Sequence, residues 1–93
     1  MVAGVTTIKV TSPGNTRYAV TVEDNEGVSV HEVTVTPAHV DRYAPGATPE
    51  ALVEASFRFL LEHEPKHAIL AQFDLPVIER YFPDYPSEVR RHL

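Results

Sequence analysis

The feature that most constrains the fold is a change of period along the chain. From residue 7 to residue 36, apolar residues recur at every second position, with mostly Thr, Lys, Arg or Glu between them. This is the period of strands that are buried on one face only. Turn-forming residues at 12–16 and 24–27 divide the region into three strands. The sequence therefore predicts a three-stranded antiparallel meander over residues 5–36, with one apolar face.

The lengths of the two turns predict the register of the meander. With turns at 12–16 and 24–27, Val10 lies opposite Tyr18 and Val20 lies opposite His31. One apolar face then runs across all three strands without a bulge.

A long helix is predicted to cover this apolar face. Thr48, Pro49 and Glu50 provide an N-cap, a proline at the first helical position and an acid near the positive end of the helix dipole. From Thr48 to His63 the apolar residues occupy an arc wider than one sheet can cover. We therefore expect a second layer on this helix, formed by shorter C-terminal helices at 65–72, 75–82 and 87–92. The predicted core consists of Ile8, Val20, Val33, Leu52, Phe59, Leu60, Ile69 and Ile78.

These elements predict an α+β fold in a single domain spanning residues 1–93. The meander takes up 5–36, a proline-interrupted connection 37–47, and the helical part 48–93. The chain is 43% hydrophobic and 23% charged, which is typical of a globular protein. Because it has no cysteine, disulfides, thiolate metal sites and thiol nucleophiles are excluded.

The chain shows no membrane or secretion signal. No apolar run approaches the roughly twenty residues of a membrane-spanning helix. The first four residues lack the basic and then apolar pattern of a signal peptide. We therefore expect a cytoplasmic protein without membrane contact.

One motif suggests a metal-dependent enzyme. Residues 63–67 read His-Glu-Pro-Lys-His, a literal match to the H-E-x-x-H zinc-peptidase signature. That chemistry requires both histidines on one helical turn. Pro65 would break this turn at a cost of about 3 kcal/mol, and it suits the first position of a new helix better. We therefore predict no metal site, cofactor or catalytic residue here, and an enzyme is the least favoured of three functional hypotheses.

His31 is the other histidine that stands out, because the predicted register places it on the apolar face. Sequence spacing brings no acid, serine or second histidine to it. We interpret it as a histidine at the edge of the core that makes one hydrogen bond.

Exposed apolar groups favour a non-catalytic interaction or regulatory module, whose partner the sequence does not identify. The register directs Val28 and Val30 to the water-facing side of the sheet, although a bulge near His31 would return them to the apolar face. The stretch 81–86 is rich in aromatic residues and proline. It is either a closure of the core or an exposed docking patch. The candidate interaction patch consists of Val28, Val30, Tyr81, Phe82 and Tyr85.

The same features leave open whether the chain is a monomer or a homodimer. The first strand carries only Lys9 as a charged residue, which protects a sheet edge poorly against pairing. A symmetric dimer would cover the exposed apolar groups. A net charge of −5 favours solubility and is compatible with a monomer.

Nucleic-acid binding is the second hypothesis. Residues 65–85 have the outline of a helix-turn-helix, but the expected recognition helix at 75–82 is mostly apolar. Its phosphate contacts would have to come from Lys66, Arg80, Arg90 and Arg91. With 8 basic and 13 acidic residues in the chain, this function is less favoured than protein binding.

The stretch from Arg17 to His92, about four fifths of the chain, resembles a set of small uncharacterised prokaryotic proteins. The resemblance lies in residues 31–35, residues 50–61 and a closing stretch at 73–83 that reads Phe-Asp-Leu-Pro-Val-Ile-Glu-Arg-Tyr-Phe-Pro. It implies a cytoplasmic prokaryotic origin and transfers no activity, cofactor or catalytic residue. A looser likeness to small antitoxins rests on size and element order alone.

Overall fold

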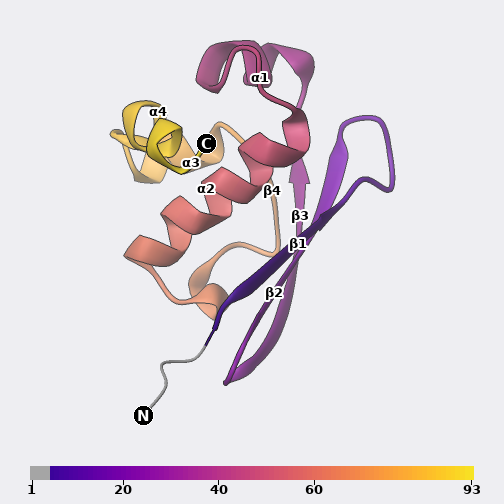
Figure 1. The fold of residues 1–93 in the computed structure, drawn as a ribbon, viewed down its shortest axis with the longest axis vertical. Coiled ribbons are helices and arrows are strands. Elements are labelled where there is room, and N and C mark those ends of the chain that lie inside the picture. Colours follow the sequence, from indigo (N-terminus) through magenta and orange to yellow (C-terminus); the bar gives the residue numbers. More distant parts are fainter. Residues whose placement is uncertain (1–4) are drawn as a thin grey trace.

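The computed structural model describes residues 5–93 and contains one sheet with the strand order β1-β2-β3-β4 (Figure 1). β1 (Thr7–Thr11), β2 (Arg17–Asp24) and β3 (Gly27–Thr34) form the antiparallel meander. β4 (Gln72–Asp74) lies parallel to the end of β3. The α+β class is confirmed, but the prediction of three strands is wrong, because a short strand from the C-terminal half makes the sheet mixed.

The register of the meander is correct in one pairing and wrong in the other. Val20 lies opposite His31 as predicted, and no bulge interrupts β3. Val10, however, lies opposite Val20 rather than Tyr18. A shift of two residues keeps the same side chains on the apolar face, so the period of the sequence does not distinguish these registers.

Two helices follow the meander. α1 (Pro37–Tyr43) lies in the predicted connection and begins with a capping box in which Thr36 and His39 bond each other's main-chain N–H. α2 (Pro49–His63) begins at the predicted N-cap, where the Thr48 hydroxyl accepts a hydrogen bond from the Ala51 N–H at 3.1 Å. In Figure 1, α2 lies between the sheet and the C-terminal helices.

The predicted helix at 65–72 is wrong. The chain forms only one 3₁₀ turn there, η1 (Lys66–Ala68), and then extends into β4. Contacts with β3 hold this extension. The Ala71 carbonyl accepts from the Glu32 N–H at 2.7 Å, and the Leu70 carbonyl lies 2.8 Å from His31 Nδ1. These tertiary hydrogen bonds replace the local ones that a helix would offer.

The last segment forms three short helical pieces, α3 (Val77–Tyr81), α4 (Tyr85–Glu88) and η2 (Val89–His92). They are the expected second layer on α2. The buried core includes these predicted members: Val20, Val33, Leu52, Phe59, Leu60, Ile69 and Ile78. Ile8, predicted with them, is only half-buried because β1 is an edge strand. In residues 5–93, no helix has the length and apolar character needed to cross a membrane.

Candidate functional site

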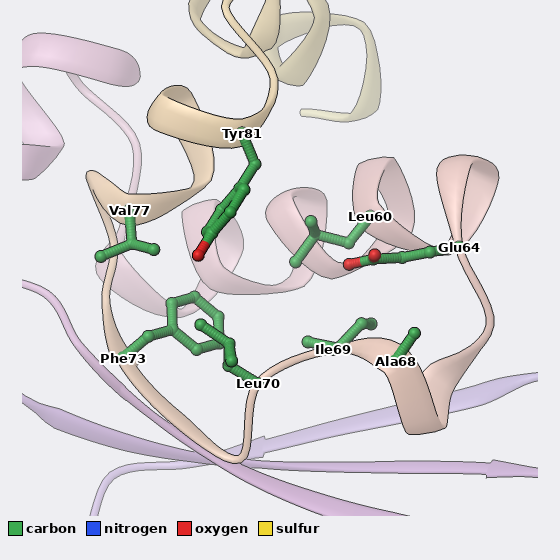
Figure 2. A pocket seen from close by; sticks show the side chains of 8 residues that line it. All are labelled: Leu60, Glu64, Ala68, Ile69, Leu70, Phe73, Val77 and Tyr81. Carbon is green, nitrogen blue, oxygen red and sulfur yellow. The ribbon is translucent and has the colours of Figure 1, made fainter.

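An apolar pocket of about 240 Å³ opens where α2 ends, between η1, β4 and α3 (Figure 2). We call it the β4 pocket. Four separate segments of the chain supply its walls. Its lining consists of Leu60, Glu64, Ala68, Ile69, Leu70, Phe73, Val77 and Tyr81.

Helical and strand periodicity explain how these side chains converge. Leu60 and Glu64 lie one helical turn apart at the end of α2, and Val77 and Tyr81 are related in the same way on α3. Phe73 is the central residue of β4 and pairs with Val33, so both point to the covered side of the sheet.

Two of the lining side chains carry polar groups. Glu64 reaches into the β4 pocket from the end of α2, and Tyr81 reaches in from α3 (Figure 2). Glu64 is half-buried, and within residues 5–93 its carboxylate makes no ion pair and no hydrogen bond. Glu79 differs, since it accepts from the Tyr43 hydroxyl at 2.7 Å and pairs with Arg42 at 2.9 Å. These two donors lower the pKa of Glu79.

His31 fixes one wall of the β4 pocket. Its ring is 3% exposed, packs 5.3 Å from the Phe57 ring, and makes two hydrogen bonds rather than the single one expected. The Leu70 carbonyl can only accept, so Nδ1 donates to it, and in the neutral ring Nε2 accepts from the Ser29 hydroxyl at 2.8 Å. Serine and histidine at this distance resemble a nucleophile and its base. Here the buried His31 ring donates to the Leu70 carbonyl, so the pair positions Leu70.

The H-E-x-x-H match does not form a metal-binding turn. α2 ends at His63, and His67 belongs to the separate turn η1. The His63 ring packs instead against Phe59 and Phe82, at centroid distances of 4.6 and 5.0 Å. In the described part of the chain, no three His, Asp or Glu side chains gather in a way that could hold a metal ion.

The predicted interaction patch is divided by the fold. Val28 and Val30 are exposed on the outer face of β3, at 56% and 62%, whereas Tyr81 lies beside the β4 pocket on the opposite side of the sheet. Tyr85 is fully buried, so its place in an exposed patch is wrong. Phe82 is half-buried, with its ring 5.6 Å from that of Phe59. For Tyr85 and Phe82 the alternative interpretation, closure of the core, is correct.

The predicted phosphate contacts also separate. Lys66 is buried and its Nζ lies 2.8 Å from Asp24, so its prediction as a nucleic-acid contact is wrong. The aliphatic part of the Lys66 side chain is buried, and its ammonium group pairs with Asp24. Arg80, Arg90 and Arg91 are exposed, and Arg91 pairs with Glu88 at 3.3 Å.

Sequence reasoning missed most of the β4 pocket. Glu64 attracted notice only as part of the rejected zinc signature, and Leu70 and Val77 only as members of expected helices. The pocket depends on the pairing of β4 with β3. A strand of three residues is too short to show a periodic pattern in the sequence, so this pairing could not be predicted. Comparisons with protein-family models, with curated proteins and with solved structures found no match.

Proposed function

We propose that this chain is a small, non-catalytic interaction module that accepts one apolar side chain of a protein partner in the β4 pocket. The volume of the pocket is the observation that carries the proposal. Drug-sized ligands occupy pockets of about 300–1,000 Å³. An apolar cavity of about 150 Å³ holds benzene. A pocket of about 240 Å³ therefore suits one aromatic or long aliphatic side chain.

The surroundings of the pocket support a protein partner. Leu70 is 48% exposed and Tyr81 is 68% exposed, so large apolar side chains border the opening. Aromatic anchors around a pocket are typical of the centres of protein interfaces. The alternative, nucleic-acid binding, has less support, because Lys66 pairs with Asp24 and, in the described part of the chain, the only charged residue lining the pocket is an acid.

A peptide selection tests the proposal. We expect a phage-displayed random peptide library, panned on the full chain, to yield peptides that share an apolar residue. Binding should perturb the NMR amide signals of Leu70, Phe73 and Val77. The substitution Ala68→Leu places a larger side chain at the pocket wall and should weaken binding at least tenfold.

Ala71→Leu is the matched control, because Ala71 is exposed on the same segment but does not line the pocket. It should leave the affinity within about twofold of the parent. Peptides that bind Ala68→Leu as well as the parent would place the interaction elsewhere and refute the proposal.

We also propose that two copies associate weakly through the free edge of β3. The Val35 N–H bonds the Thr16 carbonyl, so the alternation of the antiparallel ladder directs the main-chain groups of Val28 and Val30 away from β2. β4 covers only residues 32–34 of this edge. In an antiparallel pairing that places Val28 of one copy opposite Val30 of the other, all of these main-chain groups form hydrogen bonds. So short a contact is smaller than the interfaces of stable dimers.

A further inference from the structure

We infer that the partner segment is basic: it places a lysine or arginine next to the apolar side chain, so that the cation meets Glu64 at the wall of the β4 pocket. This inference rests on the proposed function and specifies its ligand. The class of ligand is a cationic, amphipathic peptide segment.

The dehydration of Glu64 is the first argument. In the empty pocket its half-buried carboxylate, which has no partner in residues 5–93, can be hydrated through the opening. An apolar side chain that fills the pocket displaces that water. The removal of water from a carboxylate is unfavourable when no other hydrogen-bond donor replaces that water. A neutral ligand therefore binds against this cost, whereas a ligand with its own cation offsets it through a charge-assisted hydrogen bond.

The positions of the other charged groups are the second argument. Among residues 5–93, Glu64 is the only charged residue that lines the β4 pocket. Lys66, two residues after Glu64, pairs instead with Asp24, and no ion pair within residues 5–93 involves Glu64. Nothing in the lining therefore neutralises the carboxylate. The pocket is complementary to a positive group held close to an apolar one.

Tyr81 strengthens this complementarity. Its ring lines the same pocket as Glu64, and both side chains extend into it (Figure 2). The face of a phenol ring attracts a cation within about 6 Å of its centre. The pocket therefore offers a ligand cation a second favourable group besides Glu64.

Three small probes test the charge preference directly. 2-Phenylethylammonium, 2-phenylethanol and 3-phenylpropanoate share an aromatic ring and differ in charge. Titrations of the full chain at pH 7 and low salt, followed by NMR, give their affinities at the resonances of Leu70, Phe73 and Val77. We expect the ammonium probe to bind about fivefold more tightly than the alcohol, and the carboxylate probe more weakly than both.

Substitution of the carboxylate separates this effect from general attraction to an acidic protein. Glu64→Gln should abolish the preference for the ammonium over the alcohol. Glu62→Gln is the control, because it removes the same charge two residues before Glu64, in the last turn of α2 and outside the pocket. It should keep the preference. Added salt should reduce the preference in the parent and have little effect in Glu64→Gln.

The outcomes distinguish the inference from the proposed function. Equal binding of the ammonium and the alcohol at the pocket would overturn the inference and leave the proposed function standing. A preference that survives in Glu64→Gln would also overturn the inference. If none of the three probes perturbs the pocket resonances, the proposed function fails and the inference fails with it.

Discussion

At the scale of single residues, the buried hydroxyl of Tyr85 shows how a polar group is accommodated in the helical layer. The Ser56 hydroxyl donates to the Leu52 carbonyl at 2.7 Å and therefore accepts from the Tyr85 hydroxyl at 2.6 Å. Within residues 5–93, no buried side-chain nitrogen or oxygen lacks a partner. Burial raises the pKa of Tyr85 well above its usual value near 10, so the folded protein keeps this phenol protonated.

We expect Tyr85→Phe to lower the free energy of unfolding by about 0.5–1.5 kcal/mol at pH 7, because one hydrogen bond is lost while Ser56 keeps its bond to Leu52. The raised pKa also predicts a pH dependence. Stability from the protonated phenol is fully present below about pH 10, where tyrosine in the unfolded chain begins to ionise, and is lost as the pH rises further. Urea unfolding from pH 7 to 11 should show a shallower alkaline decline in Tyr85→Phe. Parallel declines in both proteins would contradict this prediction.

At the scale of elements, the sequence predicts those parts whose signals are local. The cap at Thr48 and the break at Pro65 identify α2, whose observed range is Pro49–His63. The alternation of residues identifies β2 and β3. β4 has three residues and no measurable period, and side chains 40 positions apart in the sequence meet across its pairing with β3. The candidate site depends on that pairing, so the sequence predicts its residues as parts of helices and not as a pocket.

The free edge of β3 carries a prediction about self-association. We expect the average mass measured by sedimentation to rise above that of one chain between about 10 µM and 1 mM. Val30→Lys should keep the protein monomeric over the same range, because like charges would lie close together at the paired edges. Thr21→Lys is the control, since Thr21 lies opposite Val30 on the inner strand β2. An unchanged mass in the parent over the whole range would exclude pairing at this edge.

At the scale of the whole molecule, Phe59 joins the helical pieces into one core. Its ring packs within 4.6–5.6 Å of the rings of His63, Phe82 and Tyr85, and it is 1% exposed. We expect Phe59→Ala to cost about 3–5 kcal/mol in the free energy of unfolding, a large part of the about 5–15 kcal/mol of a typical domain. Leu70→Ala, at a side chain that is 48% exposed, should cost less. Equal melting temperatures for Phe59→Ala and the parent would show that the helices are held by other contacts.

The parallel pairing of β4 with β3 also bears on how the molecule reaches its native state. The meander pairs strands that are adjacent in the sequence. β4 pairs with β3 although α1, α2 and η1 lie between them in the sequence. Contacts between residues far apart in the sequence form slowly, because the chain loses conformational entropy on loop closure before these contacts stabilise the fold. A nascent chain from which residues 72–81 have not yet left the ribosome lacks β4 and α3 at the surface of the sheet. Ligand capture at the β4 pocket would therefore report that β4 has paired with β3.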